Sequence, residues 1–209
     1  MNHGFGVHMR TINPSAMSRY SKIEVRDIAI SVFVLSIAFA VMFFRRGSDL
    51  GFPELMGISA VIVLTSFVIH ELAHKFVAQR YGAWAEYRMF PYGLIMALML
   101  ALIAGIIFAA PGAVYIRGNI DRAMNGKISA AGPATNIVFG TIAVVLATVT
   151  VGLLSSVFWI MASINAFFAV FNMLPIMPFD GSKIYKWNIA VYLLMLAAAV
   201  ALLAYAWFS

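Results

Sequence analysis

Residues 67–79 read FVIHELAHKFVAQ and contain a His-Glu-x-x-His motif made of His70, Glu71 and His74. Residues four apart lie on one face of a helix, so the two imidazoles can bind the same metal ion. Glu71 follows the first histidine and can reach a water molecule at that ion without ligating the metal itself. Zinc is the usual metal at such a site, with three protein ligands and one open position. We therefore expect one Zn²⁺ per chain, with a third ligand from elsewhere in the sequence.

The composition places this motif in a membrane. Of the 209 residues, 63% are apolar and 11% are charged, whereas water-soluble domains carry about 25% charged residues. Several apolar runs approach the roughly 20 residues that cross a bilayer as a helix. The net charge of +6 comes from basic residues scattered between these runs, which favours the lipid bilayer over nucleic acid as a partner. The chain has no cysteine, which excludes thiolate metal ligands and cysteine nucleophiles.

The apolar runs predict an all-α polytopic membrane protein with five to six transmembrane helices. The expected spans are residues 28–44, 55–80, 129–154, 157–174 and 187–208. Residues 84–90 and 112–118 alternate in type like short strands, and we expect them to form a small membrane-associated β element. Gly132 and Pro133 are expected in the first turn of the third long span, where proline is favoured.

The chain is expected to form a single domain behind a short tail. Residues 1–27 are polar and basic, and they are interpreted as a cytoplasmic N-terminal tail. Residues 28–209 form one membrane-embedded domain, because the length leaves no room for a separate soluble domain. The core of that domain is residues 55–181, which include the histidine motif.

The positions of the basic residues predict the topology, because cytoplasmic loops of membrane proteins are rich in lysine and arginine. With a cytoplasmic N-terminus, the histidine-bearing span ends inside, and every basic residue except Arg45 and Arg46 lies inside. The basic loops on either side of residues 92–110 both favour the cytoplasm. We therefore expect this apolar segment to re-enter the membrane and leave on the same side. The alternative is a six-crossing topology in which the segment spans the membrane.

The third zinc ligand is predicted by elimination. After the motif, the chain has only three acidic residues, Glu86, Asp121 and Asp180. Glu86 lies in a predicted strand beyond the end of the histidine helix, and Asp121 lies among basic residues in a solvated loop. Asp180 follows a long apolar span, at a depth where a carboxylate is costly unless it is paired or bound to a cation. We therefore predict that Asp180 is the third ligand, with a helix-end cap as its alternative role.

Three motifs together resemble the site-2 protease family of intramembrane zinc metalloproteases. They are HELAH at 70–74, GPATN at 132–136 and NMLPIMPFDG at 172–181. The resemblance covers roughly residues 55–181 and is to the prokaryotic and archaeal type of the family, without a PDZ or CBS domain. The long apolar insert at 92–110 departs from the better-known pattern.

The resemblance implies a role for each residue of the motifs. Zinc would be held by His70, His74 and Asp180, and Glu71 would be the acid/base residue. Asn172 would hydrogen-bond the substrate or stabilise the oxyanion. The family also places its active site near the cytoplasmic face of the membrane, in agreement with the charge pattern.

These features predict an intramembrane zinc metalloprotease of the cell membrane, which hydrolyses peptide bonds in or near transmembrane segments of substrate proteins (regulated intramembrane proteolysis). The alternative is a catalytically silent membrane zinc-binding protein or a metal transporter, which would not need the base Glu71. A membrane zincin completed by a later glutamate fits poorly, because no glutamate follows Glu86. Asn165 is expected to form hydrogen bonds between helices, and Asn136 is either a residue of the same kind or part of the site. The substrate and the oligomeric state are left open.

Overall fold

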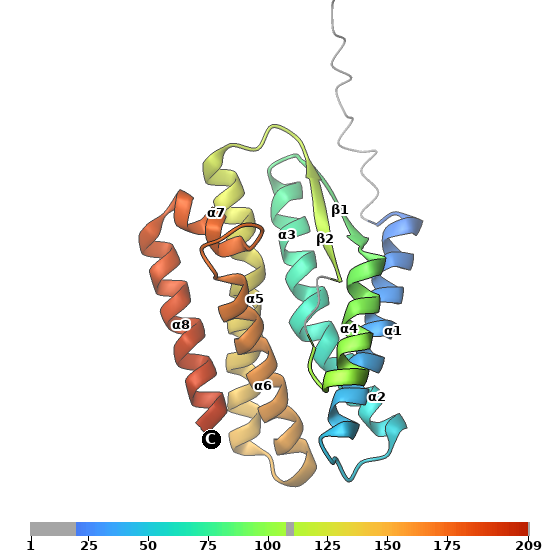
Figure 1. Cartoon of the computed structure of the whole chain (residues 1–209). Helices are drawn as coiled ribbons and strands as arrows, with labels where there is room; N and C mark the ends of the chain where they lie inside the picture. The colour runs from blue at the N-terminus through green and yellow to red at the C-terminus, as the bar shows by residue number, and fades with distance from the viewer. Residues whose placement is uncertain (1–19, 108–110, 209) are drawn as a thin grey trace, which may run out of the picture.

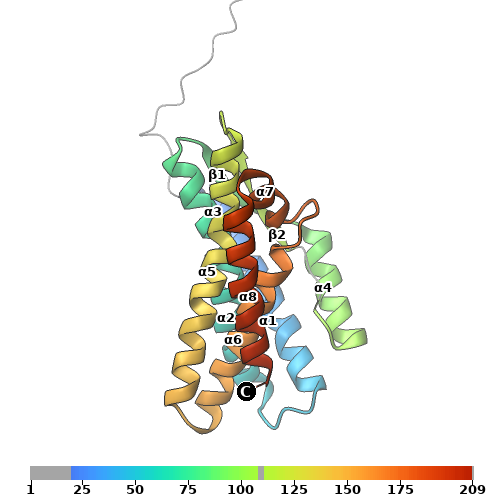
Figure 2. The same ribbon diagram turned by 90° about the vertical axis from the view of Figure 1, so that its left-hand side faces the viewer.

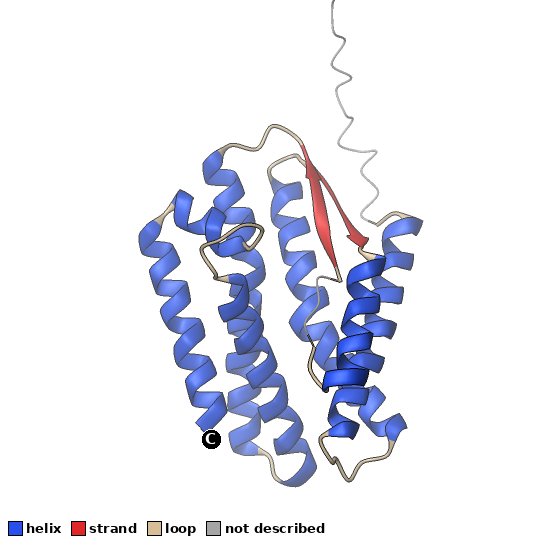
Figure 3. Ribbon diagram, in the orientation of Figure 1, coloured by secondary structure: helices blue, strands red, loops and turns tan. Residues whose placement is uncertain are grey.

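Five long apolar helices dominate the structure, a computed structural model that describes residues 20–107 and 111–208. All five are long and apolar enough to cross a membrane, and they stand side by side in Figures 1 and 3. They are α1 (Lys22–Arg45), the continuous helix Phe52–Arg80, α5 (Arg122–Val149), α6 (Gly152–Asn172) and α8 (Ile189–Phe208). The shorter elements are α4 (Pro91–Ala104), α7 (Asp180–Trp187) and an antiparallel sheet of β1 (Trp84–Met89) and β2 (Gly112–Arg117). The predicted polytopic helical fold with a small β element is therefore confirmed.

The histidine-bearing span is one helix with a widened turn inside it. α2 (Phe52–Val63) leads into a π-helical turn, Leu64–Val68, and then into α3 (Ile69–Arg80). Pro53 lies in the first turn of α2, where its missing N–H needs no partner. Gly82 follows the end of α3 with φ +75°, a left-handed conformation that favours glycine. A single π turn inside an α-helix is often found at a functional site.

The first helix begins before its apolar run. α1 starts at Lys22, ahead of the predicted span, and the Ser21 hydroxyl caps it by accepting a hydrogen bond from the Glu24 N–H at 3.1 Å. The polar first turn is stabilised inside the protein, because the buried Glu24 carboxylate is ion-paired with the buried ammonium of Lys75 in α3. Residues 1–19 of the predicted tail lie outside the described residues.

The apolar segment after β1 begins and ends at neighbouring points of the fold. β1 and β2 are antiparallel with Met89 opposite Gly112, so the chain returns to the point that it left. Between the two strands, α4 packs beside α1 and stands out from the bundle in Figure 2. The Arg45 guanidinium donates hydrogen bonds to the carbonyls of Leu102, at 2.6 Å, and Ile103 at the end of α4. A cation there satisfies carbonyls that the helix itself leaves open.

The start of α5 differs from the prediction. The expectation that Gly132 and Pro133 open a helix is wrong, because α5 starts at Arg122 and Pro133 lies inside it. The Asp121 carboxylate caps this helix by accepting a hydrogen bond from the Met124 N–H at 2.7 Å. The turns before Gly132 contain polar residues, so an apolar run does not reveal them. Proline has no N–H for the carbonyl one turn earlier, which weakens the helical hydrogen bonding at that turn.

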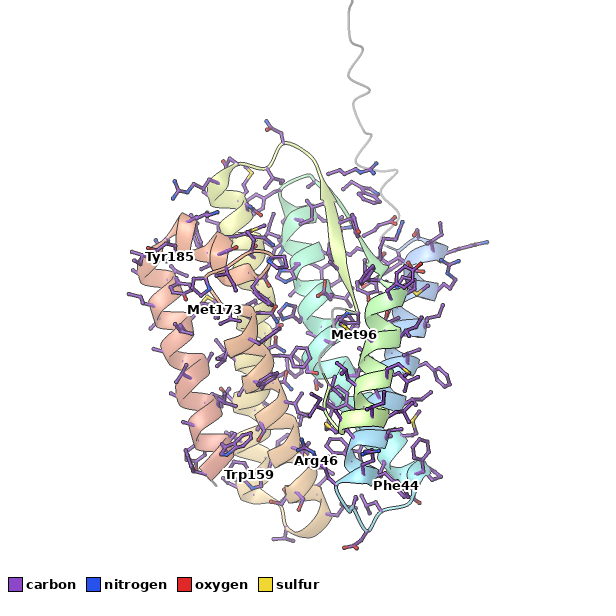
Figure 4. The ribbon with its side chains drawn as sticks, viewed as in Figure 1. Phe44, Arg46, Met96, Trp159, Met173 and Tyr185 are labelled. Atoms are coloured by element: carbon purple, nitrogen blue, oxygen red, sulfur yellow. The ribbon has the colours of Figure 1, made fainter. Side chains whose placement is uncertain are left out.

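The two ends of the bundle differ in charge. In Figure 4, Arg46 and Phe44 lie at the end opposite Tyr185 of α7. Arg45 and Arg46 share their end with Asp49 and Glu54, close together in sequence. The other described basic residues belong to segments toward the Tyr185 end: Lys22, Arg26, Lys75, Arg80, Arg88, Arg117, Arg122, Lys127, Lys183 and Lys186. One end is therefore strongly basic and the other is nearly neutral.

Candidate metal site

The three predicted ligand side chains meet beside α3. The Nε2 atoms of His70 and His74 lie 3.0 Å apart. The Oδ2 atom of Asp180 lies 3.1 Å from His74 Nε2 and 3.5 Å from His70 Nε2. All three residues are buried. Among the residues that the structure describes, this is the one group of three His, Cys, Asp or Glu side chains whose ligand atoms lie within 4.8 Å of one another.

Asp180 reaches the histidines from the first residue of α7. α6 ends at Asn172, and residues 173–179 connect it to α7. A Cβ on Gly181 would overlap the main-chain carbonyl of Met173, so the close packing of α7 on this connection requires glycine. Burial raises the pKa of the Asp180 carboxyl, but the two neighbouring imidazoles lower that pKa by more and hold it below its usual range. The side chain is therefore a carboxylate at neutral pH.

Each imidazole uses its Nδ1 atom for a hydrogen bond to α5 and turns Nε2 toward Asp180. His74 Nδ1 donates to the main-chain carbonyl of Ile128 at 2.8 Å. His70 Nδ1 donates to Oδ1 of Asn136 at 2.5 Å. The proton of His74 is assigned to Nδ1 because a carbonyl oxygen can only accept. Metal-binding histidines commonly donate their second N–H in this way, which fixes the ring and its tautomer.

α5 approaches the two rings closely because the residue that faces them is a glycine. A Cβ on Gly132 would overlap the Nε2 atoms of both His70 and His74. Asn136, one helical turn later on the same face, contacts the His70 ring. The sequence leaves Asn136 open between a residue packed between helices and a site residue, and the structure shows its contact with His70. The feature of the sequence that points to this contact is the spacing of four residues between Gly132 and Asn136 in the GPATN motif, which places both on one face of the helix.

A cavity of about 290 Å³ adjoins the three ligand atoms. Glu71 and Asn172 both line it. Oε2 of Glu71 accepts a hydrogen bond from the Val114 N–H of β2 at 3.1 Å. The Asn172 side-chain N–H donates to the Phe168 carbonyl at 3.0 Å, one turn earlier in α6. The predicted base and the predicted oxyanion donor therefore face the same space as the ligand atoms.

The donor set fits a zinc ion. Two imidazole nitrogens and a carboxylate oxygen, with one position left open, are a known three-ligand set for catalytic zinc. Donors bound tetrahedrally at about 2.0–2.1 Å from zinc lie about 3.3 Å apart, and the separations here are 3.0, 3.1 and 3.5 Å. With both Nδ1 protons donated to α5, the two Nε2 atoms and Oδ2 of Asp180 are the atoms left to bind a cation.

Comparisons with known proteins agree with this geometry. The family model described as Peptidase family M50 matches residues 147–193, which include Asn172 and Asp180. "Putative zinc metalloprotease MJ0611" of Methanocaldococcus jannaschii is 42% identical over 175 residues, which are 81% of this chain and 87% of that protein. "Putative zinc metalloprotease YwhC" of Bacillus subtilis is 30% identical over 155 residues, which are 63% of this chain and 68% of that protein. "Putative zinc metalloprotease Rip3" of Mycobacterium tuberculosis is 34% identical over 138 residues, which are 62% of this chain and 31% of that protein. No solved structure gives a significant match.

The fold and these similarities define a multi-pass membrane protein of the metalloprotease class. The chain belongs to peptidase family M50, the site-2 protease family. The resemblance that the three sequence motifs carry is therefore confirmed. The relatives above carry the name "putative zinc metalloprotease", and the grouped side chains of His70, His74 and Asp180 could hold that metal.

Proposed function

We propose that this protein is an intramembrane zinc metalloprotease that hydrolyses peptide bonds in or near transmembrane segments of other membrane proteins. The proposed zinc ligands are His70, His74 and Asp180, with one ion per chain. The observation that carries the proposal is the convergence of these three ligand atoms beside a cavity that Glu71 also lines. Zinc held there would act as a Lewis acid, which polarises a carbonyl and makes water a nucleophile at neutral pH.

In the proposed reaction, Glu71 moves the proton. Its carboxylate accepts a proton from the attacking water as the oxygen bonds to the scissile carbonyl carbon. Glu71 then passes this proton to the leaving nitrogen as the C–N bond breaks, which gives a carboxylate and an amine as products. The hydrogen bond from the Val114 N–H holds one carboxylate oxygen and orients the other toward the cavity. Asn172 is the proposed donor to the carbonyl oxygen, where negative charge develops.

The edge of β2 that lines the cavity is the proposed place for the substrate. The carbonyls of a substrate helix are tied up in hydrogen bonds along the helix, so the segment must unwind before cleavage. Val114 is paired with Tyr87 of β1, and its N–H points away from β1 to Glu71, so this edge of β2 faces the cavity. The outer edge of β1 is covered by α1, because the Tyr87 N–H donates to the Glu24 carboxylate at 3.0 Å and the Met89 N–H to the Asp27 carboxylate at 3.4 Å. An extended substrate segment would therefore add as a strand to β2.

The charge distribution supports an orientation with the active site near the cytoplasm. α7, the C-terminal end of α3 and the N-terminal end of α1 share the strongly basic end of the bundle. Because cytoplasmic segments are rich in lysine and arginine, this end is the proposed cytoplasmic side, with the N-terminus on the same side. Asp180 at the start of α7 then places the ligand atoms on that side of the bilayer midplane.

The experiment that tests this function is Glu71→Gln in the full chain, purified in detergent and mixed with a panel of single-span membrane proteins. Cleavage should fall by at least about 100-fold, because the base is lost. The bound zinc should stay equal to that of the wild type, because Glu71 is not a ligand. Cleavage is measured by mass spectrometry of the products, and zinc by elemental analysis.

Glu54→Gln is the matched control, because Glu54 lies in the first turn of α2, at the opposite end of the bundle. This variant should cleave like the wild type. Equal cleavage by Glu71→Gln and the wild type would contradict the proposed mechanism. A wild-type protein that binds zinc but cleaves none of the panel would support the catalytically silent alternative.

A further inference from the structure

Behind the His70 ring lies a chain of buried amides that the proposed reaction does not use. The Asn136 side-chain N–H₂ donates to the Ser66 carbonyl at 2.8 Å and to Oδ1 of Asn165 at 3.0 Å. The Asn165 side-chain N–H₂ donates in turn to the Met161 carbonyl at 2.9 Å. Asn136, Asn165 and Ser66 are all fully buried. This chain of hydrogen bonds links α6 and the π-helical turn to a proposed zinc ligand through α5.

The two main-chain carbonyls at the ends of this chain fix the direction of every hydrogen bond in it. The Met161 carbonyl can only accept, so the Asn165 amide must direct its N–H₂ there and its oxygen at Asn136. The Ser66 carbonyl and this oxygen both require the N–H₂ of Asn136. Oδ1 of Asn136 is therefore left facing His70.

The direction of the Asn136 amide decides where His70 carries its proton. Facing an oxygen at 2.5 Å, Nδ1 must be protonated, which leaves the lone pair of Nε2 free for a metal ion. A flipped Asn136 would donate to Nδ1 and so place the proton on Nε2, where it would block ligation. The flip would also bring Oδ1 of Asn136 against two other oxygens.

We propose that Asn165 is a positioning residue for zinc binding, which acts through Asn136 to hold His70 in the tautomer with a free Nε2. This inference rests on the assignment of His70 as a zinc ligand in the proposed function. Asn165 touches neither the ligand atoms nor the cavity, and it lies on a different helix from all three proposed ligands. Its effect on the metal passes through directed hydrogen bonds.

The test is the zinc affinity of the purified full chain, measured by competition with a chelator, for wild type, Asn165→Leu and Asn165→Asp. Leucine fills the space but can neither accept from Asn136 nor donate to Met161, so the affinity should fall about 10-fold or more. A neutral aspartic acid offers one acceptor and one donor in nearly the same shape. Asn165→Asp should therefore recover most of the wild-type affinity.

Ser163→Ala is the matched control, because it removes a half-buried side-chain donor from the same helix without touching the amide chain. Its zinc affinity should equal that of the wild type. In an Asn136→Leu background, adding Asn165→Leu should cause no further loss, because the two residues act in series. If Asn165→Leu folds poorly, Asn165→Ala is measured with the same expectations.

Three results would overturn the assignment: wild-type affinity in Asn165→Leu, an equal loss in Ser163→Ala, or additive losses in the double variant. A failure of Asn165→Asp to recover affinity would also contradict it, since shape would then matter and hydrogen-bond direction would not. The readout is independent of proteolysis. A wild-type protein that binds zinc without cleaving substrates would therefore end the proposed function and leave this inference standing.

Discussion

The two faces of α3 around the site are built in different ways. His70 and His74 lie against α5, where a buried amide holds the His70 ring and a main-chain carbonyl holds the His74 ring. A glycine lets the helix come close to both rings. Glu71 lies against β2, where a single main-chain N–H holds it at the wall of a cavity. The closed face is suited to holding a metal ion, and the open face to admitting a substrate. Mutations on the two faces should therefore affect metal affinity and turnover separately.

Of the two faces, the larger effect is expected on the closed face, from Gly132→Ala. The new Cβ would overlap both Nε2 atoms, so the rings or the whole of α5 must move. Overpacking of this kind costs about 1–3 kcal/mol, and the displaced rings should also lose zinc affinity. We expect a lower thermal unfolding temperature and loss of bound zinc, measured by calorimetry and elemental analysis.

Gly57→Ala is the control for Gly132→Ala, since a Cβ at Gly57 in α2 meets no atom within 4 Å. This variant should keep its zinc and be slightly more stable, because alanine favours a helix more than glycine does. Normal zinc content in Gly132→Ala would show that the close approach of α5 is not needed for the site.

A smaller effect is expected on the open face, from Val114→Pro. Proline removes the N–H that holds Glu71, while the β1–β2 ladder is kept because this N–H points away from β1. One hydrogen bond is worth about 0.5–1.5 kcal/mol, so kcat/KM should fall about 3-fold to 10-fold. Zinc affinity should not change. The measurement is steady-state cleavage together with chelator competition.

Val114→Ala retains the N–H and serves as the control for Val114→Pro. Its kcat/KM should stay close to the wild-type value. If Val114→Pro instead loses zinc and keeps its turnover, the proposal that one face of α3 holds the metal and the other serves turnover is wrong.

Much of the architecture can be predicted from the sequence, because membrane-spanning helices consist of long runs of apolar residues. The five long apolar helices and the small sheet are predicted correctly. The meeting of Asp180 with the histidines also follows, since the chain offers few acidic residues after the motif. The helix starts do not follow. α1 and α5 extend into polar sequence whose partners, such as Lys75 for Glu24, are set only by the tertiary structure.

The hydrogen bonds that hold the His70 ring cannot be predicted from the sequence either. Asn165 bonds to a neighbouring helix, as predicted, but nothing local to it points to the ligand two steps away. Asn136 finds its partners on three different elements, including the π-helical turn that contains Ser66. An amide can bond to almost any polar neighbour, so its pattern in the sequence does not specify which one it meets.

The most direct test of the central claim is X-ray absorption spectroscopy at the zinc edge, on the purified wild type and Asp180→Ala. The wild type should show two imidazole nitrogens and oxygen ligands around a single zinc ion, as the grouped side chains indicate. Asp180→Ala should lose zinc affinity by more than about 100-fold, since a direct ligand matters more than the residues that support ligands. Asp121→Ala, which removes a helix cap far from the site in sequence, should leave the spectrum unchanged. Full zinc occupancy and an unaltered spectrum in Asp180→Ala would contradict the account.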